Sequence, residues 1–331
     1  MTSGQEDRHG MWHGTYDGHG DLVRLSARDA ELDSLPPLPA AVEDPAGLLE
    51  LRLDGNAFTA FPEPLRDMSG LEALSLYRNR LTSVPRWAGS LTGLRSLNLA
   101  ANRLTTLPDE FGELARLHTL DLGHNELTEL PDALGRLTGL DRCLYLSNNR
   151  LTAIPAALCR LTALRYLNVT DNLLTALPAE FGDLAALREL RLYNNRLVAL
   201  PDSLGRLGEL REAHLMGNAL TSLPASTGDL AALRELRLMD NELESLPRSI
   251  GRLKRLRILD LRNNHLTALP PSLGDLSGLT HLDLRNNHLT ELPDALSKLP
   301  ALEKLDLRWN DIDPWPDWLE DLERHGCAVL R

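Results

Sequence analysis

The chain has 331 residues, of which 43% are hydrophobic and 25% are charged, and this composition is typical of a soluble folded protein. Its formal net charge of −12 argues against non-specific binding to nucleic acid or to an anionic membrane surface, because both need an excess of basic residues. The first residues, MTSGQEDRHGMWHG, contain no apolar targeting segment, and no later apolar run is long enough to cross a bilayer.

The amino-terminal part of the chain is predicted to contain two segments. Residues 1–20 are polar and rich in Gly and His, so we expect a flexible leader. Residues 21–46 contain LVRLSARDAELDSLP, which fits the pattern L-x-L-x-x-N-x-L-x-x-L-P with Ala27 for the second Leu and Ala30 for Asn. This segment is predicted to be a degenerate first repeat, and it begins a single domain that extends from 21 to 331.

The full pattern recurs through residues 47–310. Its Asn is found at twelve positions: Asn56, Asn79, Asn102, Asn125, Asn149, Asn172, Asn195, Asn218, Asn241, Asn264, Asn287 and Asn310. Every step is 23 residues except one of 24 after Asn125, where the extra residue around Asp141–Cys143 is expected to bulge one strand. Since no repeat of this length can bury its own leucines, the twelve repeats must stack to share one core.

The pattern within one repeat predicts a strand, a turn and a short return segment. Leu259 and Leu261 alternate with polar residues, which is the period of a strand with one buried face. Asn264 ends the strand, and its amide can satisfy backbone donors and acceptors of neighbouring coils. Leu266 fills the interior, and Pro270 begins the return segment PxxLGxL, which is long enough for a helical turn only.

Residues 311–331 depart from the repeat and are predicted to form a carboxy-terminal cap. The stretch DPWPDWLEDLERHGCAVL places Trp315, Trp318, Leu319 and Leu322 on one face of a short amphipathic helix. Such a helix would close the last coil, and the tryptophans are assigned to packing rather than to a ligand site.

The period, the L-x-L-x-x-N-x-L-x-x-L-P pattern and the return segment LPxxLGxL resemble the 23-residue intracellular leucine-rich repeats of Ras-pathway scaffolds and of many bacterial proteins. The resemblance covers residues 22 to about 322. It implies an α/β solenoid, a right-handed horseshoe with a parallel β-sheet on its concave face and short helical or 3-10 turns on its convex side. It also implies protein recognition on the concave face, but names no partner. Ala30, Cys159 and Ser297 depart from the family pattern.

The outward strand positions are the candidate binding residues, because the Leu and Asn positions serve the scaffold. They lie six, four and two residues before each repeated Asn. Four of the five tyrosines and two methionines fall there, and these are predicted apolar anchors for a partner: Tyr77, Tyr145, Tyr166, Tyr193, Met216 and Met239. The alternative is that strands simply favour Tyr.

Charged side chains at the same outward positions form columns beyond the anchors. The basic ones are predicted to orient the partner: Arg191, His214, Arg237, Arg262, Arg285 and Arg308. Neighbouring Glu and Asp columns allow a second interpretation, a solvated surface that neutralises itself.

The sequence favours a non-enzymatic module that binds a partner protein on its concave face. No nucleophile motif or phosphate-binding loop is found, His9, His13 and His19 match no standard metal site, and no cofactor is expected. Two alternatives stay open: an enzyme or cofactor-binding protein using a concave site around Cys143, Tyr145 and Tyr166, and a self-assembling structural protein. Since the three cysteines form no disulfide framework, we expect a cytoplasmic protein, and the abundance of Arg over Lys suggests a bacterial one. We expect it to be a monomer.

Overall fold

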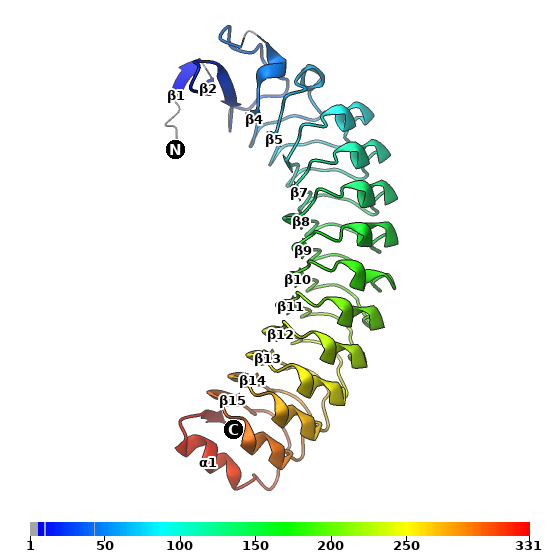
Figure 1. The fold of residues 1–331 in the computed structure, drawn as a ribbon, viewed down its shortest axis with the longest axis vertical. Coiled ribbons are helices and arrows are strands. Elements are labelled where there is room, and N and C mark those ends of the chain that lie inside the picture. The colour runs from blue at the N-terminus through cyan, green and yellow to red at the C-terminus, as the bar shows by residue number, and fades with distance from the viewer. Residues whose placement is uncertain (1–5, 10, 43) are drawn as a thin grey trace. The chain divides into compact units, whose positions relative to one another are not determined.

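A computed structural model describes residues 6–9, 11–42 and 44–331. The chain divides into two compact units, Met1–Leu151 and Thr152–Arg331. In both units short strands alternate with short 3-10 helices, and the strands lie on the opposite side of the coils from the helices (Figure 1). This arrangement confirms the predicted fold class, an α/β solenoid of leucine-rich-repeat type.

In the first unit two antiparallel strand pairs precede a run of parallel ones. Its strands are β1 (Glu6–His9), β2 (Trp12–Tyr16), β3 (Leu22–Ser26), β4 (Glu50–Arg52), β5 (Ala73–Ser75), β6 (Ser96–Asn98), β7 (Thr119–Asp121) and β8 (Cys143–Tyr145). β1 pairs with β2 and β2 with β3 antiparallel, whereas β3 to β8 pair in parallel. Its 3-10 helices are η1 (Pro45–Gly47), η2 (Glu63–Asp67), η3 (Arg86–Ser90), η4 (Asp109–Glu113) and η5 (Asp132–Arg136).

In the second unit every neighbouring strand pair is parallel. The strands are β9 (Tyr166–Asn168), β10 (Glu189–Arg191), β11 (Glu212–His214), β12 (Glu235–Arg237), β13 (Ile258–Asp260), β14 (His281–Asp283), β15 (Lys304–Asp306) and β16 (Ala328–Leu330). The 3-10 helices are η6 (Ala156–Arg160), η7 (Phe181–Asp183), η8 (Asp202–Arg206), η9 (Ala225–Asp229), η10 (Arg248–Arg252), η11 (Pro271–Asp275) and η12 (Asp294–Lys298). One α-helix, α1 (Trp318–Arg324), follows them.

The repeated asparagines hold consecutive coils together, as the sequence predicted. Asn264 is 3% exposed; its Nδ2 donates to the carbonyls of Leu238 and Leu261 at 3.0 and 2.9 Å, and its Oδ1 accepts from the N–H of Leu243 at 3.0 Å. One side chain therefore satisfies backbone groups in its own coil and in the preceding one. A buried polar group left without such a partner costs about 1–3 kcal/mol. The repeated asparagines are therefore a main determinant of how consecutive coils stack.

The glycines of the return segment let neighbouring 3-10 helices approach closely. A Cβ added at Gly228 would lie 2.3 Å from the carbonyl oxygen of Ser249, and one added at Gly251 would lie 2.2 Å from that of Ser272. Larger side chains are excluded there because the backbone of the next coil occupies their space. Cys159 of η6 and Ser297 of η12 replace the glycine at this position.

Part of the predicted flexible leader, residues 1–5 and 10, lies outside the described residues, and the rest contains two strands. Within the described residues before 21, β1 and β2 form an antiparallel hairpin whose second strand pairs with β3. Trp12 is 3% exposed, and its Nε1 donates to the carbonyl of Pro37 at 3.2 Å. The burial of the indole ring and the pairing of β2 with β3 hold this segment against the first coil.

The carboxy-terminal cap contains the predicted helix and one strand that was not predicted. Leu319 and Leu322 of α1 are buried, and Trp318 Nε1 donates to Asp294 Oδ1 at 3.2 Å. After α1 the chain adds β16 to the edge of the sheet, parallel to β15. The helix and the strand together cover the last coil.

The extra residue near Asp141 does not bulge a strand, which corrects that expectation. β8 pairs with β7 in regular register, Thr119 opposite Cys143 and Asp121 opposite Tyr145. The turn before the strand absorbs the insertion, where His118 Nδ1 lies 2.9 Å from Asp141 Oδ1. A turn accommodates an added residue at lower cost than a strand, because no ladder hydrogen bond is lost.

Candidate functional site

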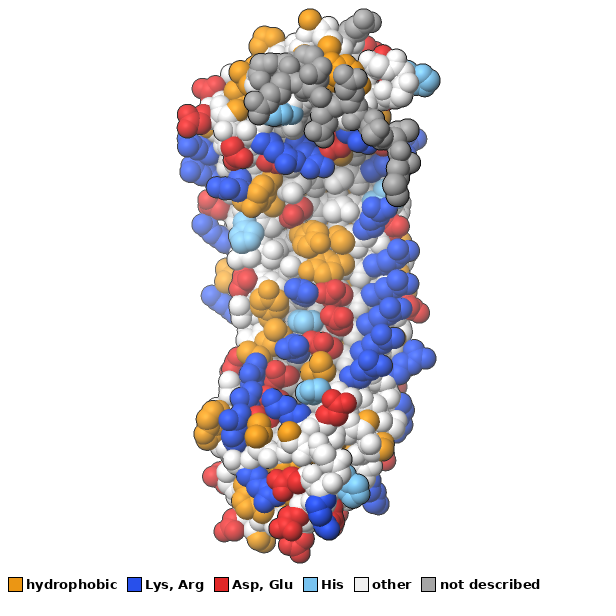
Figure 2. Space-filling view, turned by 90° about the vertical axis from the view of Figure 1, so that its left-hand side faces the viewer, with side chains coloured by type: hydrophobic (Ala, Val, Ile, Leu, Met, Phe, Trp, Pro, Cys, Tyr) orange, Lys and Arg blue, Asp and Glu red, His pale blue; other side chains and the backbone are white. Residues whose placement is uncertain are grey.

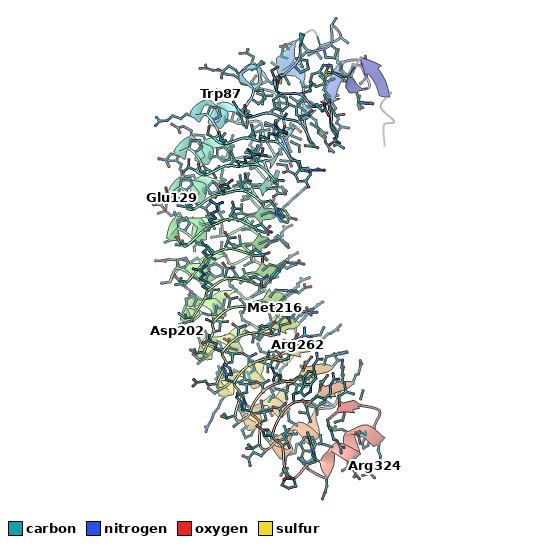
Figure 3. All side chains as sticks on the ribbon, turned by 180° about the vertical axis from the view of Figure 1, so that it is seen from behind. Trp87, Glu129, Asp202, Met216, Arg262 and Arg324 are labelled. Carbon is teal, nitrogen blue, oxygen red and sulfur yellow. The ribbon has the colours of Figure 1, made fainter. Side chains whose placement is uncertain are left out.

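The outward strand positions form regular columns within each unit. Parallel register places Glu189 beside Glu212 and Arg191 beside His214, and the same alignment continues through β15. The central residue of each strand, such as Leu190, is buried. We call the surface made by the outward residues and by the residue directly before each repeated Asn the strand face. Met216 and Arg262 project from this side of the second unit, whereas Asp202 lies among its 3-10 helices (Figure 3).

The predicted anchors are divided between the two units. Tyr77 and Tyr145 belong to the first unit, and Tyr77 is 40% exposed. A hollow of about 250 Å³ beside it is lined by Arg52, Asp54 and Tyr77, among others. The first unit therefore has its own small polar hollow with one aromatic side chain at its rim.

The other predicted anchors lie in the second unit. They are Tyr166, Tyr193, Met216 and Met239, all partly exposed. The guanidinium of Arg191 lies 5.7 Å from the centre of the Tyr166 ring, and Arg191 Nε donates to Glu189 Oε1 at 2.6 Å. These contacts fix Arg191 over the ring, so the two predicted site residues form one rigid group.

His214 is the predicted basic residue that is most enclosed. Its side chain is 13% exposed, and its Nε2 lies 3.6 Å from Glu212 and 3.7 Å from Glu235, which is too long for a hydrogen bond. Burial lowers the pKa of His214; the charge of Glu235 raises it, and Arg191 and Arg237 lower it further, so the net direction is downward. The imidazole is therefore neutral at neutral pH.

The last three predicted arginines form ion pairs within the chain. Arg285 Nη2 lies 2.6 Å from Asp283 Oδ2, and Arg308 Nη2 lies 2.7 Å from the fully buried Asp306. Burial raises the pKa of Asp306, but the hydrogen bond from Arg308 and the charge of Arg285 outweigh it and hold the pKa below its ordinary value. Arg262 is 3.5 Å from Asp260. The arginine column and the aspartate column therefore largely neutralise each other's charge.

One exposed residue of the strand face, Trp309, was missed from the sequence. It is 70% exposed, and the Arg308 guanidinium lies 5.5 Å from its ring. Met239, Arg262, Arg285 and Trp309 line a hollow of about 260 Å³, and Arg262 Nη2 donates to Met239 Sδ at 2.7 Å. The available signal was a Trp directly before the repeated Asn, where eight of the other eleven repeats have Asn, Asp or Gly.

The space-filling view shows hydrophobic side chains set among basic and acidic ones on this face (Figure 2). Such a mixture of apolar anchors and polar surroundings is typical of a protein-binding surface.

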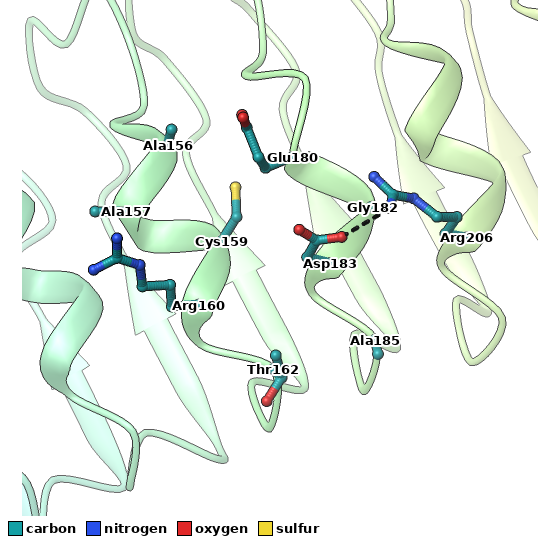
Figure 4. A pocket seen from close by; sticks show the side chains of 10 residues that line it. All are labelled: Ala156, Ala157, Cys159, Arg160, Thr162, Glu180, Gly182, Asp183, Ala185 and Arg206. Carbon is teal, nitrogen blue, oxygen red and sulfur yellow. Dashed lines mark ion pairs between the residues drawn. The ribbon is translucent and has the colours of Figure 1, made fainter.

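A further hollow of the second unit lies among its 3-10 helices (Figure 4). It measures about 760 Å³, opens to solvent, and is lined by Cys159, Arg160, Glu180, Asp183 and Arg206, among others. It lies between η6 and η7, where Cys159 replaces the return-segment Gly. Burial raises the pKa of the Cys159 thiol to about 11, and the charges of Glu180 and Asp183 act in the same direction. The thiol is therefore protonated and unreactive at neutral pH.

The alternative site around Cys143 involves residues of both units. Cys143 and Tyr145 lie in β8 of the first unit and Tyr166 in β9 of the second, so the predicted site stays a prediction. Among the residues that the structure describes, no group of three or more His, Cys, Asp and Glu side chains could hold a metal ion. No helix in the described part of the chain is long and apolar enough to cross a membrane.

Family models of leucine-rich repeats match most of the chain. A leucine-rich repeat region matches residues 155–243 and 225–324, a second leucine-rich repeat model matches 46–104 and 92–142, and a third matches 142–161. A search of curated protein sequences finds no significant match.

Solved structures with a similar fold include proteins from several sources. A leucine-rich-repeat protein of Leptospira interrogans is 29% identical, with 92% of this chain and 94% of that chain covered and a TM-score of 0.62. The FLRT2 leucine-rich-repeat part of an octameric complex with latrophilin 3 and Unc5D is 26% identical, with 79% and 80% covered and a TM-score of 0.65. An internalin of Listeria monocytogenes, at 21% identity, 93% and 86% coverage and a TM-score of 0.73, shows similarity of fold alone.

Proposed function

Because this chain belongs to the leucine-rich-repeat family, we propose that it is a non-enzymatic interaction module that binds a partner protein on its strand face. Leucine-rich repeats generally serve protein–protein interaction, and the similar FLRT2 domain was solved in a complex with other proteins. The finer assignments go with this proposal: a 23-residue intracellular repeat type, a cytoplasmic location in a bacterium, a monomer, and a domain that extends from 21 to 331.

The observation that most supports the proposal is the hollow beside Trp309. A large aromatic ring that is 70% exposed has no role in the core, and Met239 supplies a second apolar surface beside it. Aromatic and Met side chains dominate the energy of many protein interfaces, with polar neighbours around them. Arg262 and Arg285 supply such neighbours, and their ion pairs keep their positions fixed.

The neighbouring anchors Tyr193 and Met216 extend the apolar surface along the same face of the second unit. Tyr77 and Tyr145 are proposed as further contacts in the first unit. Both sets can be tested independently, because each lies within one unit.

The test is an affinity capture from a cell lysate with quantitative mass spectrometry. A strand-face variant combines Tyr193→Ala, Met216→Ala and Trp309→Asn; Asn is chosen because four other repeats have it at that position. We expect a protein retained by the wild type to bind the variant more weakly by over about 2 kcal/mol.

A matched control changes three exposed side chains away from the strand columns, with Arg196→Ala, Val198→Ala and Arg248→Ala. The control should capture the same protein as the wild type, and both variants should keep the wild-type Tm within a few degrees. Equal capture by the strand-face variant would refute the proposal.

A further inference from the structure

Five successive repeats of the second unit place an arginine directly before the strand. We call these residues the arginine ladder: Arg165, Arg188, Arg211, Arg234 and Arg257. All five are exposed. Basic side chains follow one another along one edge of the strand-bearing side of the molecule (Figure 2).

The backbone holds the arginine ladder in register. The N–H of Arg188 donates to the carbonyl of Arg165 at 2.9 Å, and the N–H of Arg211 donates to that of Arg188 at 2.8 Å. In the same way the N–H of Arg234 donates to the carbonyl of Arg211, and the N–H of Arg257 to that of Arg234, each at 2.8 Å. Since parallel strands lie about 4.8 Å apart, five arginines extend over about 19 Å.

The arginine ladder is not neutralised by the chain itself. In the described residues no ion pair joins any of the five arginines to a carboxylate; the adjacent glutamates pair with strand-face residues instead, as Glu189 does with Arg191 and Glu235 with Arg237. Not every arginine at this position is free of ion pairs, because Arg95 of the first unit lies 3.4 Å from Glu72. Like charges at this spacing repel each other, so an anionic ligand would relieve a repulsion that is already present.

The surroundings of the arginine ladder leave room for a ligand. Two residues before the arginines the chain has small side chains at Ala163, Ala186 and Ala232, with Glu209 and Arg255 at the other two positions. Small neighbours let a ligand reach the guanidinium groups, each of which can bind a carboxylate through two parallel hydrogen bonds.

We propose that the arginine ladder binds an acidic segment of a partner protein, in which carboxylates recur over about 20 Å. Single-stranded nucleic acid would need several aromatic side chains on which its bases stack. Among the residues directly after the five arginines only Tyr166 is aromatic, and the Arg191 guanidinium already lies 5.7 Å from the centre of its ring. A long polyanion would reach beyond the arginine ladder and be repelled by the rest of a chain whose net charge is −12. A short acidic segment would contact the arginine ladder alone. This surface is distinct from the strand-face anchors, so either proposal can fail while the other stands.

The test measures fluorescence anisotropy with a labelled peptide of alternating Glu and Ser, its Gln counterpart, and an oligothymidylate of similar length. The ladder variant combines Arg188→Ala, Arg211→Ala and Arg234→Ala in the full chain. We expect it to bind the Glu peptide at least about ten-fold more weakly than the wild type at low salt, because three exposed charge pairs are lost together. The Gln peptide should bind neither protein.

A control variant with Arg160→Ala, Arg196→Ala and Arg248→Ala removes the same charge from exposed residues of the second unit outside the ladder. It should bind the Glu peptide within about two-fold of the wild type. Equal weakening of peptide binding in both variants would show that binding depends on the net charge of the chain and not on the arginine ladder, and would overturn the proposal. Failure of the wild type to bind the Glu peptide would overturn it as well. Tighter, ladder-dependent binding of oligothymidylate would assign the ladder to nucleic acid, and a self-association that only the ladder variant loses would assign it to a second copy. Both results would also overturn the proposal.

Discussion

The residue before each repeated Asn has a left-handed backbone, with φ of 55° at Asn194, 62° at Gly217 and 59° at Trp309. Gly and Asn adopt this conformation at low cost, whereas a bulky side chain costs about 1–2 kcal/mol there. Trp309 is therefore an unfavourable choice for the scaffold. A strained and exposed aromatic residue points to a role in binding. The alternating strand pattern does not single it out, because Trp309 lies one residue outside that alternation.

At the same scale, His214 is expected to make stability depend on pH. Its pKa lies below the ordinary value of 6.5, chiefly because of burial. The unfolded chain therefore takes up the proton first as the pH falls. The contribution of His214 to the unfolding free energy is therefore fully present above pH 6.5. It is lost as the pH falls from 6.5 through the pKa that His214 has in the folded chain.

Urea unfolding of the wild type and of His214→Gln at pH 7.5 and 5.0 measures this effect. The wild type should lose more unfolding free energy between the two pH values than the variant does. Carboxylates titrate in both proteins, so only the difference between the two losses reports on His214. An equal or larger loss in the variant would show that the folded chain does not disfavour the protonated imidazole.

At the scale of elements, the regular coils and the carboxy-terminal helix could be predicted from the sequence, whereas the amino-terminal hairpin and β16 could not. Asn264 and Pro270 recur in all twelve repeats and Leu259 in eleven of them, so each prediction was supported by many copies. The hairpin of β1 and β2 has no such copy, and the contact of Trp12 with Pro37 joins two segments without a shared pattern. The ion pairs of Arg285 with Asp283 and Asp306 also depend on side-chain conformations, which an alignment of the repeats does not determine.

The close approach of neighbouring 3-10 helices predicts the effect of a single methyl group. Gly228→Ala would place a Cβ 2.3 Å from the carbonyl oxygen of Ser249, so η9 and η10 must move apart. We expect the unfolding free energy to fall by about 1–3 kcal/mol, as for other overpacked sites.

Gly208→Ala is the matched control, because a Cβ at Gly208 would meet nothing within 4 Å. Its unfolding free energy should match that of the wild type or rise slightly, since Ala restricts the unfolded chain. Denaturant unfolding of the two variants measures the contrast. Equal stability of both would show that the glycine is not required for helix packing.

At the scale of the whole molecule, recognition is proposed to use side chains on a scaffold whose core residues are repeated. The leucine and asparagine positions explain the coils, and they leave the outward positions free to vary. The chain combines a net charge of −12 with local pairing on the strand face and an unpaired arginine ladder at its edge. Two chemically different surfaces, one with apolar anchors and one basic, therefore lie in the second unit.

The measurement that tests the central claim most directly is hydroxyl-radical footprinting of the full chain with and without a captured partner. The radical oxidises Met, Tyr and Trp side chains, so Tyr193, Met216, Met239 and Trp309 are built-in reporters on the strand face, and Trp318 in α1 is a reporter away from it. We predict that the partner protects Met239 and Trp309 and their neighbours while oxidation of Trp318 is unchanged. Protection of Trp318 with undiminished oxidation of Met239 and Trp309 would contradict the claim that the strand face binds the partner.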